Sequence, residues 1–160
     1  MVTITTKPFG EIEVDEKQKL HFPEGILGFN AIKHFWLLEQ KGSPFYWLQA
    51  DDDATLAFLA IHPDSFMPDY ELSILDEEYT AIGIENEKED LLCLLIVTVP
   101  SNPADISANL LGPIIINLKT RMARQAISLN EAYTTNYKIL SHMKEMGTTS
   151  GKQKQTGGKN

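Results

Sequence analysis

The first half of the chain alternates between apolar and polar positions with the two-residue period of half-buried β-strands. Residues 2–6 and 11–14 alternate in this way and contain many β-branched side chains. Residues 35–39 and 45–49 are rich in aromatic side chains, which favour strands. The connection at 40–44 contains a glycine and a proline, so these two strands are predicted to form a hairpin.

The segment at 91–99 is almost continuously apolar. This composition predicts a central strand that is covered on both faces of its sheet. Cys93 lies within the segment, and a buried thiol is an inert core group rather than a nucleophile. Further strands are predicted at 56–61, 114–116 and 125–129.

Two short helices and one apolar loop complete the pattern. Acidic residues begin a predicted helix at 76–82, and Gly83 follows as its cap. Asn130 is a suitable N-cap for a second short helix, which would continue through residue 137 or as far as residue 143. The loop at 23–29 carries three large apolar side chains and is therefore expected to pack down as a lid.

These elements predict an all-β fold, mainly antiparallel, which forms a small sandwich or a partly open β-barrel-like domain with one or two short helices. Turn signals recur at about ten-residue spacing, and helices are too few for a βαβ pattern. A single domain is expected over residues 1–143. Residues 144–160 contain almost no apolar side chains and are expected to form a flexible tail.

Charge is distributed unevenly along the chain. There are 14 Lys and Arg residues against 22 Asp and Glu residues, which gives a net charge of −8. Thirteen of the acidic residues and a single base lie within residues 51–90. The net charge disfavours direct binding of nucleic acid, which requires a basic face. The acidic block is either a solvated surface or a docking surface for a basic partner.

The sequence offers little catalytic or metal-binding chemistry. One cysteine excludes a disulfide framework and a CxxC zinc site. The four histidines lack HxH and HExxH spacing, and residues 51–53 do not fit an EF-hand loop, so no metal and no cofactor is expected. The apolar runs are too short to span a bilayer, and residues 1–6 lack the features of a signal peptide. We therefore expect a cytoplasmic protein with no membrane contact.

Two segments are not readily explained by packing. The first is a loop at 67–71 that places Tyr70 between Asp69 and Glu71. A tyrosine offers a large contact area at low entropic cost, which is typical of an interface. An ordinary turn before a strand is an equally good interpretation of this loop.

The second segment, residues 107–117, has an apolar stretch between Asn109 and Asn117, with Pro113 inside it. Proline cannot donate a hydrogen bond to a ladder, so a strand edge or a bulge is expected here. An exposed edge would accept a strand or a helix from a partner. The alternative is a bulged core strand whose asparagines bond the local backbone.

Six blocks of sequence together carry a resemblance to a known family. They are Phe-Pro-Glu-Gly-Ile-Leu-Gly-Phe at 22–29, Pro-Phe-Tyr-Trp-Leu-Gln at 44–49, Leu-Ala-Phe at 56–58, Pro-Asp-Tyr-Glu at 68–71, Val-Thr-Val-Pro at 97–100 and Ala-Asn-Leu-Leu-Gly-Pro-Ile-Ile-Ile-Asn at 108–117. In order and spacing the chain resembles the flagellar assembly factor W family of bacteria over about residues 3–140. It departs from the family's pattern at Gly112, where alanine is expected in many members, and at Ser107, where threonine is expected.

The resemblance implies a non-enzymatic, β-barrel-like binding protein with two partners. The first is flagellin, which such proteins bind before export. The second is the carbon storage regulator, a dimeric RNA-binding repressor of flagellin translation. The partners are expected to compete, so that export of flagellin releases the factor to remove the repressor from the message.

The residues predicted to bind these partners fall into two groups. The group expected to meet the repressor consists of Asp69, Tyr70 and Glu71, with Asp51, Asp52 and Asp53 added on charge alone. The group expected to meet flagellin consists of Asn109, Pro113 and Asn117.

Two other functional classes are alternatives. One is a small β-barrel enzyme that uses acidic residues within 51–90, which would require two carboxyl groups with opposed pKa shifts in one pocket. The other is a metabolite-binding barrel whose cavity is lined by Trp36 and Trp47.

Overall fold

The computed structural model describes residues 1–85 and 90–143. These residues form strands β1 (Val2–Thr6), β2 (Gly10–Val14), β3 (Lys19–His21), β4 (His34–Glu39), β5 (Phe45–Ala50), β6 (Ala57–Ile61), β7 (Leu91–Thr98), β8 (Ser107–Ala108), β9 (Ile114–Asn117), β10 (Ala123–Gln125) and β11 (Tyr137–Lys138). They also form the helix α1 (Asp76–Ala81) and three single-turn 3-10 helices, η1 (Glu16–Gln18), η2 (Pro63–Ser65) and η3 (Pro103–Asp105). The predicted tail at 144–160 lies outside the described residues.

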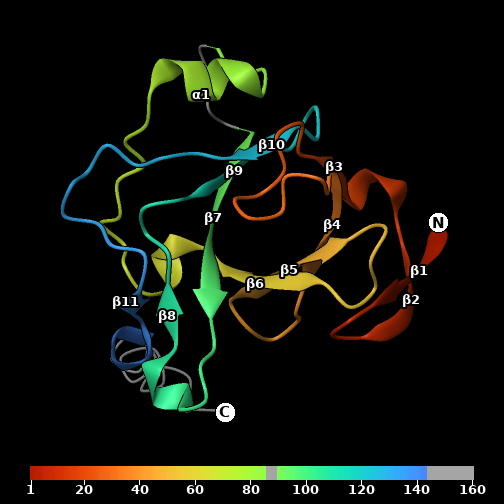
Figure 1. Cartoon of the computed structure of the whole chain (residues 1–160), viewed down its shortest axis with the longest axis horizontal. Helices are drawn as coiled ribbons and strands as arrows, with labels where there is room; N and C mark the ends of the chain where they lie inside the picture. Colours follow the sequence, from red (N-terminus) through yellow and green to blue (C-terminus); the bar gives the residue numbers. More distant parts are fainter. Residues whose placement is uncertain (86–89, 144–160) are drawn as a thin grey trace.

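The strands pair in antiparallel fashion throughout, as the sequence predicts. β1 and β2 form a separate two-stranded sheet. The larger sheet follows the path β10-β9-β7-β6-β5-β4-β3, with β8 paired to β7 and β11 paired to β8 (Figure 1). The predicted hairpin is confirmed as β4 and β5, and the predicted helix at 76–82 is confirmed as α1, which Gly83 follows with a positive φ of 83°.

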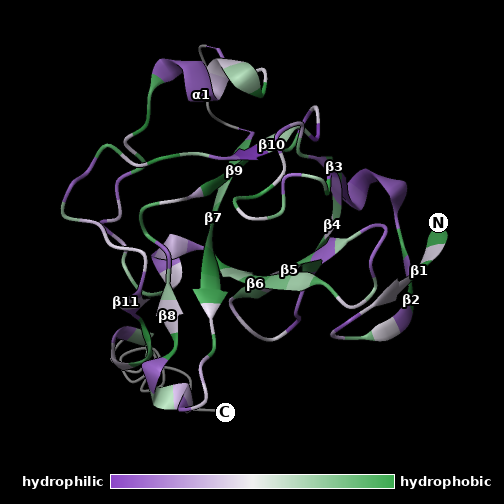
Figure 2. Ribbon diagram, viewed as in Figure 1, coloured by the Kyte–Doolittle hydropathy of each residue, from purple (hydrophilic) through white to green (hydrophobic). Residues whose placement is uncertain are grey.

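β7 is the centre of the sheet, as its apolar composition predicts. It pairs with β9 through its first half and with β6 and β8 through its second half. Figure 2 shows it as hydrophobic along nearly all of its length. Burial raises the pKa of the Cys93 thiol to about 12, which keeps this group protonated and inert at neutral pH.

The main sheet curls into a barrel that is not closed. Its first and last strands, β3 and β10, approach each other at one isolated bridge, between His21 and Met122. There the His21 N–H donates to the carbonyl of Arg121 at 2.8 Å. The concave side holds fully buried side chains from successive strands of the path, including Leu20, Phe35, Leu48, Leu94 and Ile114. The expectation of a partly open barrel is therefore confirmed.

Two predicted elements are wrong in extent or type. The sequence predicts one strand over 125–129, but β10 ends at Gln125; beyond it the N–H groups of Ala126 and Ser128 still donate to the carbonyls of Pro113 and Leu111 in the same antiparallel register. The predicted helix from Asn130 through residue 137 is absent. Instead, the Asn130 side chain accepts the Ala132 N–H at 2.9 Å in a turn, and β11 pairs with β8. Helix is present only at 140–143, the last part of the longer predicted range.

The loop at 23–29 only partly forms the predicted lid. Ile26 is buried in the core, whereas Leu27 is 83% exposed. Phe29 is partly exposed and packs edge-on against Phe58, with ring centroids 5.1 Å apart. In the part of the chain that the structure describes, no helix has the length and hydropathy needed to cross a bilayer.

Candidate functional site

The acidic turn at 51–53 joins β5 to β6. Asp51 accepts a hydrogen bond from Trp36 Nε1 at 2.8 Å, and its other carboxylate oxygen lies 3.3 Å from Lys19 Nζ. Asp53 accepts from the hydroxyl and the N–H of Thr55 at 2.6 and 3.0 Å. These bonds to Thr55 hold the pKa of Asp53 below its usual value. Asp51 and Asp53 therefore support the local structure, although all three aspartates of the turn are exposed.

The loop at 69–71 combines a structural tyrosine with two exposed acids. The Tyr70 hydroxyl donates to the Leu110 carbonyl at 2.9 Å, and its ring stacks on Tyr133 with centroids 4.8 Å apart. Burial raises the pKa of Tyr70 above its usual value. The Tyr133 hydroxyl in turn accepts the Glu71 N–H at 2.9 Å. Of the three predicted residues, Asp69 and Glu71 lie exposed, while Tyr70 is half-buried and packs against the core.

The two acidic segments are not brought together. The turn at 51–53 precedes β6, whereas the loop at 69–71 follows it. Asp51 bonds to Trp36, which belongs to the core cluster beside the β1–β2 sheet, whereas Tyr70 packs against a different cluster that includes Leu110. The acids predicted to bind the repressor therefore form two separate patches.

The segment between β8 and β9 is a bulge, one of the two placements expected for Pro113. Residues 110–113 interrupt the pairing with β7: β8 pairs with its last residues, the Asn109 N–H still donates to the Ile96 carbonyl, and β9 pairs with its first four residues. The Asn109 side chain accepts the N–H groups of Leu111 and Gly112 at 3.0 and 2.9 Å. Pro113 is buried, and its carbonyl accepts the Ala126 N–H at 2.8 Å.

Asn117 is buried, and its side chain bonds to the backbone of the chain. It donates to the Ile82 carbonyl at 2.8 Å and accepts from the N–H groups of Lys119 and Thr120 at 2.9 and 3.2 Å. Asn117 thus ties the end of α1 to the turn before β10, apart from the surface that carries Asn109. Its predicted contact with flagellin stays a prediction.

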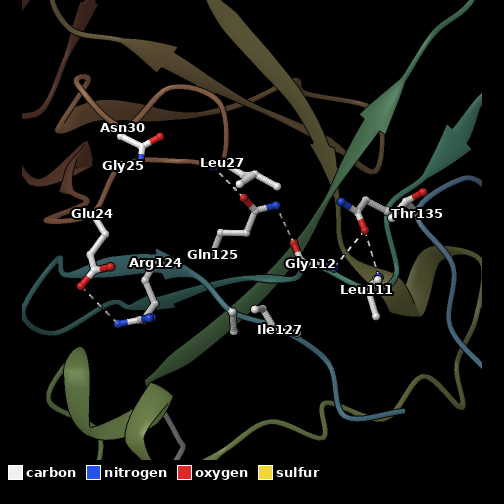
Figure 3. Close-up of a pocket in the computed structure, with 12 residues that line it drawn as sticks. Glu24, Gly25, Leu27, Asn30, Leu111, Gly112, Arg124, Gln125, Ile127 and Thr135 are labelled. Carbon is white, nitrogen blue, oxygen red and sulfur yellow. Dashed lines mark hydrogen bonds and ion pairs between the residues drawn. The ribbon is translucent and has the colours of Figure 1, made fainter. Parts of the chain in front are cut away.

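A surface cavity of about 370 Å³ lies where the barrel fails to close. The loop after β3, the bulge and β10 surround it, so the first and last of the six sequence blocks meet there (Figure 3). Its lining includes Glu24, Leu27, Asn109, Gly112, Gln125 and Ile127. Of these residues the sequence predicted only Asn109. The two predicted cavity-lining tryptophans instead pack beside the β1–β2 sheet.

Gln125 joins two walls of the cavity. Its side-chain oxygen accepts the Leu27 N–H at 3.0 Å, and its side-chain nitrogen donates to the Gly112 carbonyl at 3.1 Å (Figure 3). A Cβ added at Gly112 would lie 2.8 Å from this nitrogen. Glycine at position 112 therefore leaves room for the Gln125 carboxamide to bridge the walls.

Arg124 and Glu78 fix the side of the cavity that is formed by β10 and the residues after it. Arg124 Nε lies 2.6 Å from Oε1 of Glu78, a buried carboxylate on α1. The other oxygen of Glu78 accepts the Ile127 N–H at 3.0 Å. Glu24, at the rim, lies 4.0 Å from Arg124 and keeps 71% of its side chain exposed. The buried Glu78 carboxylate balances the charge of Arg124, so Glu24 leaves a negative charge at the exposed edge of the cavity.

Several large aliphatic side chains project from the same region. Ile127 is 67% exposed and Leu129 is 52% exposed. The residues that precede each of them, Ala126 and Ser128, are buried. The sequence correctly indicates alternation at 125–129, but the large side chains face outward and the small ones inward. We call the three exposed side chains of Leu27, Ile127 and Leu129 the apolar rim.

Comparison with known proteins identifies the family. The family model described as FliW protein matches residues 3–139. The flagellar assembly factor FliW of Leptospira biflexa is 45% identical over 149 residues, which cover 92% of this chain and 97% of that protein. The corresponding protein of Treponema denticola is 40% identical over 144 residues, covering 90% and 97%.

A solved structure agrees with these matches. A crystal structure of the flagellar assembly factor FliW superposes with a TM-score of 0.78 at 36% identity, covering 86% of this chain and 96% of that one. The resemblance inferred from the six sequence blocks is confirmed, as is the mainly antiparallel β fold. The chain therefore belongs to the FliW family of flagellar assembly factors.

Proposed function

We propose that this chain is a cytoplasmic, non-enzymatic factor that binds flagellin before export and also binds and inhibits the carbon storage regulator. In this proposal the two partners compete, so that export of flagellin frees the factor to remove the repressor from flagellin messenger RNA. The observation that carries the proposal is the family match over residues 3–139. The relatives are named as assembly factors, which supports a binding role rather than catalysis.

The chemistry of the surfaces supports a division between the partners. A repressor that holds RNA carries basic residues, and the exposed acids Asp52, Asp69 and Glu71 are suited to meet them. Complementary charge chiefly increases the association rate and excludes wrong partners. We therefore assign the repressor to the acidic patches and flagellin to the apolar surface near the bulge at 109–113.

The decisive experiment is a calorimetric titration of the protein into purified monomeric flagellin, repeated with saturating carbon storage regulator. Tight one-to-one binding that the regulator displaces is the expected result. Simultaneous binding of both partners would overturn competition and replace it with a ternary mechanism. Absence of binding to either partner would overturn the proposed function.

A further inference from the structure

The apolar rim is an exception to ordinary packing. Large aliphatic side chains in a segment of alternating burial normally face the core, but Ile127 and Leu129 face outward. The reason is that the backbone of 126–129 is fixed by hydrogen bonds from all four of its N–H groups. The acceptors, in order along the segment, are the Pro113 carbonyl, the Glu78 carboxylate, the Leu111 carbonyl and the Ser73 carbonyl.

This arrangement holds apolar side chains in water on a rigid support. Contiguous exposed apolar groups on a soluble protein mark interaction sites, and a pre-ordered surface loses little entropy when it binds. The cavity of about 370 Å³ lies directly beside Leu27 and Ile127, which both line it. A large side chain of a partner can therefore enter the cavity while its neighbours contact the rim.

The hydrogen bonding also selects the kind of partner. A strand added to a sheet edge needs free backbone N–H groups, and those of 126–129 are already used. The remaining mode for an apolar surface with a concavity is a helix that docks through its side chains. One exposed acid, Glu24, lines the cavity at this surface. A complementary helix therefore carries a basic side chain beside its apolar face.

We propose that the apolar rim and the cavity bind an amphipathic helix of flagellin, with one large apolar side chain in the cavity and a basic side chain opposite Glu24. This inference rests on the proposed function, because flagellin is the partner that it places. It moves the predicted flagellin contacts from buried Asn117 to Leu27, Ile127 and Leu129.

The test uses the full chain and monomeric flagellin in calorimetric titrations. Ile127→Ser and Leu27→Ser remove exposed side chains and leave every backbone bond in place, so both variants are expected to fold. Each should weaken flagellin binding by about tenfold, the amount that corresponds to partial burial of one aliphatic side chain. Val99→Ser is the matched control, since Val99 is 55% exposed and does not line the cavity.

The outcomes separate this inference from the proposed function. If the unaltered protein binds flagellin and both serine variants bind equally well, the docking site is wrong and the proposed function stands. If the unaltered protein does not bind flagellin, the proposed function fails and the docking site fails with it. Equal weakening by Val99→Ser would also overturn the site, because the effect would then not be local.

The charge at Glu24 has its own test. Glu24→Gln should weaken flagellin binding by about twofold to fourfold and reduce its dependence on salt, because Glu24 is largely exposed to solvent. Unchanged affinity and salt dependence would overturn the basic side chain that we place opposite Glu24. Repressor binding should be the same for Glu24→Gln, Ile127→Ser and the unaltered protein.

Discussion

The acidic turn at 51–53 and the apolar rim at the barrel opening use their side chains in opposite ways. In the acidic turn, two of the carboxylates predicted to bind a partner already accept hydrogen bonds within the chain, Asp51 from Trp36 and Asp53 from Thr55. At the rim, Leu27 is exposed although its loop is expected to pack down, and Ile127 and Leu129 project outward from the predicted strand at 125–129 because the backbone there is held by other groups. Residue type alone therefore misjudges which side chains are available.

The largest expected effect comes from removing the anchor of the rim. Glu78→Ala leaves Arg124 and the Ile127 N–H without their buried partner, and breaking a buried pair is strongly destabilising. Urea unfolding should show a loss of about 2–3 kcal/mol, below the fully buried case because part of the Arg124 side chain is exposed. Glu77→Ala is the control, since Glu77 is exposed on the same helix turn. Equal losses would refute the anchoring role.

A smaller effect is expected from Tyr70→Phe. This change removes one hydroxyl and leaves the Leu110 carbonyl without its donor, at a cost of about 1 kcal/mol. The measurement is again urea unfolding, with binding of both partners retained. Loss of repressor binding without loss of stability would instead restore Tyr70 as a direct contact, as the sequence first suggested.

Gly112→Ala is expected to act on the cavity more than on stability. The new Cβ displaces the Gln125 side chain and weakens its bonds to Gly112 and Leu27, at a cost below about 1 kcal/mol because this side chain is flexible. The loss of binding free energy for flagellin should exceed the loss of unfolding free energy. Gln125→Ala, which removes the same two bonds directly, should give a matching loss.

The smallest effect on stability is expected from Asp52→Lys. An exposed surface substitution typically changes the free energy of unfolding by less than about 0.5 kcal/mol. Repressor binding should weaken and become less dependent on salt, while flagellin binding is unchanged. The double variant Asp69→Lys with Glu71→Lys tests the second acidic patch in the same way. Equal loss of both partners in either variant would refute the division of surfaces.

The sequence predicts local pattern well and long-range bonding poorly. The hairpin β4–β5 and the central strand β7 follow from composition and alternation. The sequence places Tyr137 in a helix rather than in β11, because a two-residue strand is too short to show a period. The role of Tyr70 depends on a carbonyl at position 110, forty residues away, and no spacing rule indicates that bond. Gln125 likewise reaches Leu27 only after the sheet has curled.

The single bridge that joins β3 to β10 makes the barrel opening a measurable equilibrium. The His21 amide exchanges its hydrogen with solvent only when its bond to Arg121 breaks, so its exchange rate reports how often the two strands part. A molecule lying across the cavity contacts the loop after β3 and the segment after β10 together. Such a molecule should hold the two strands together and slow hydrogen exchange at the His21 amide, so the exchange rate of this amide reports how much of the protein has the cavity occupied.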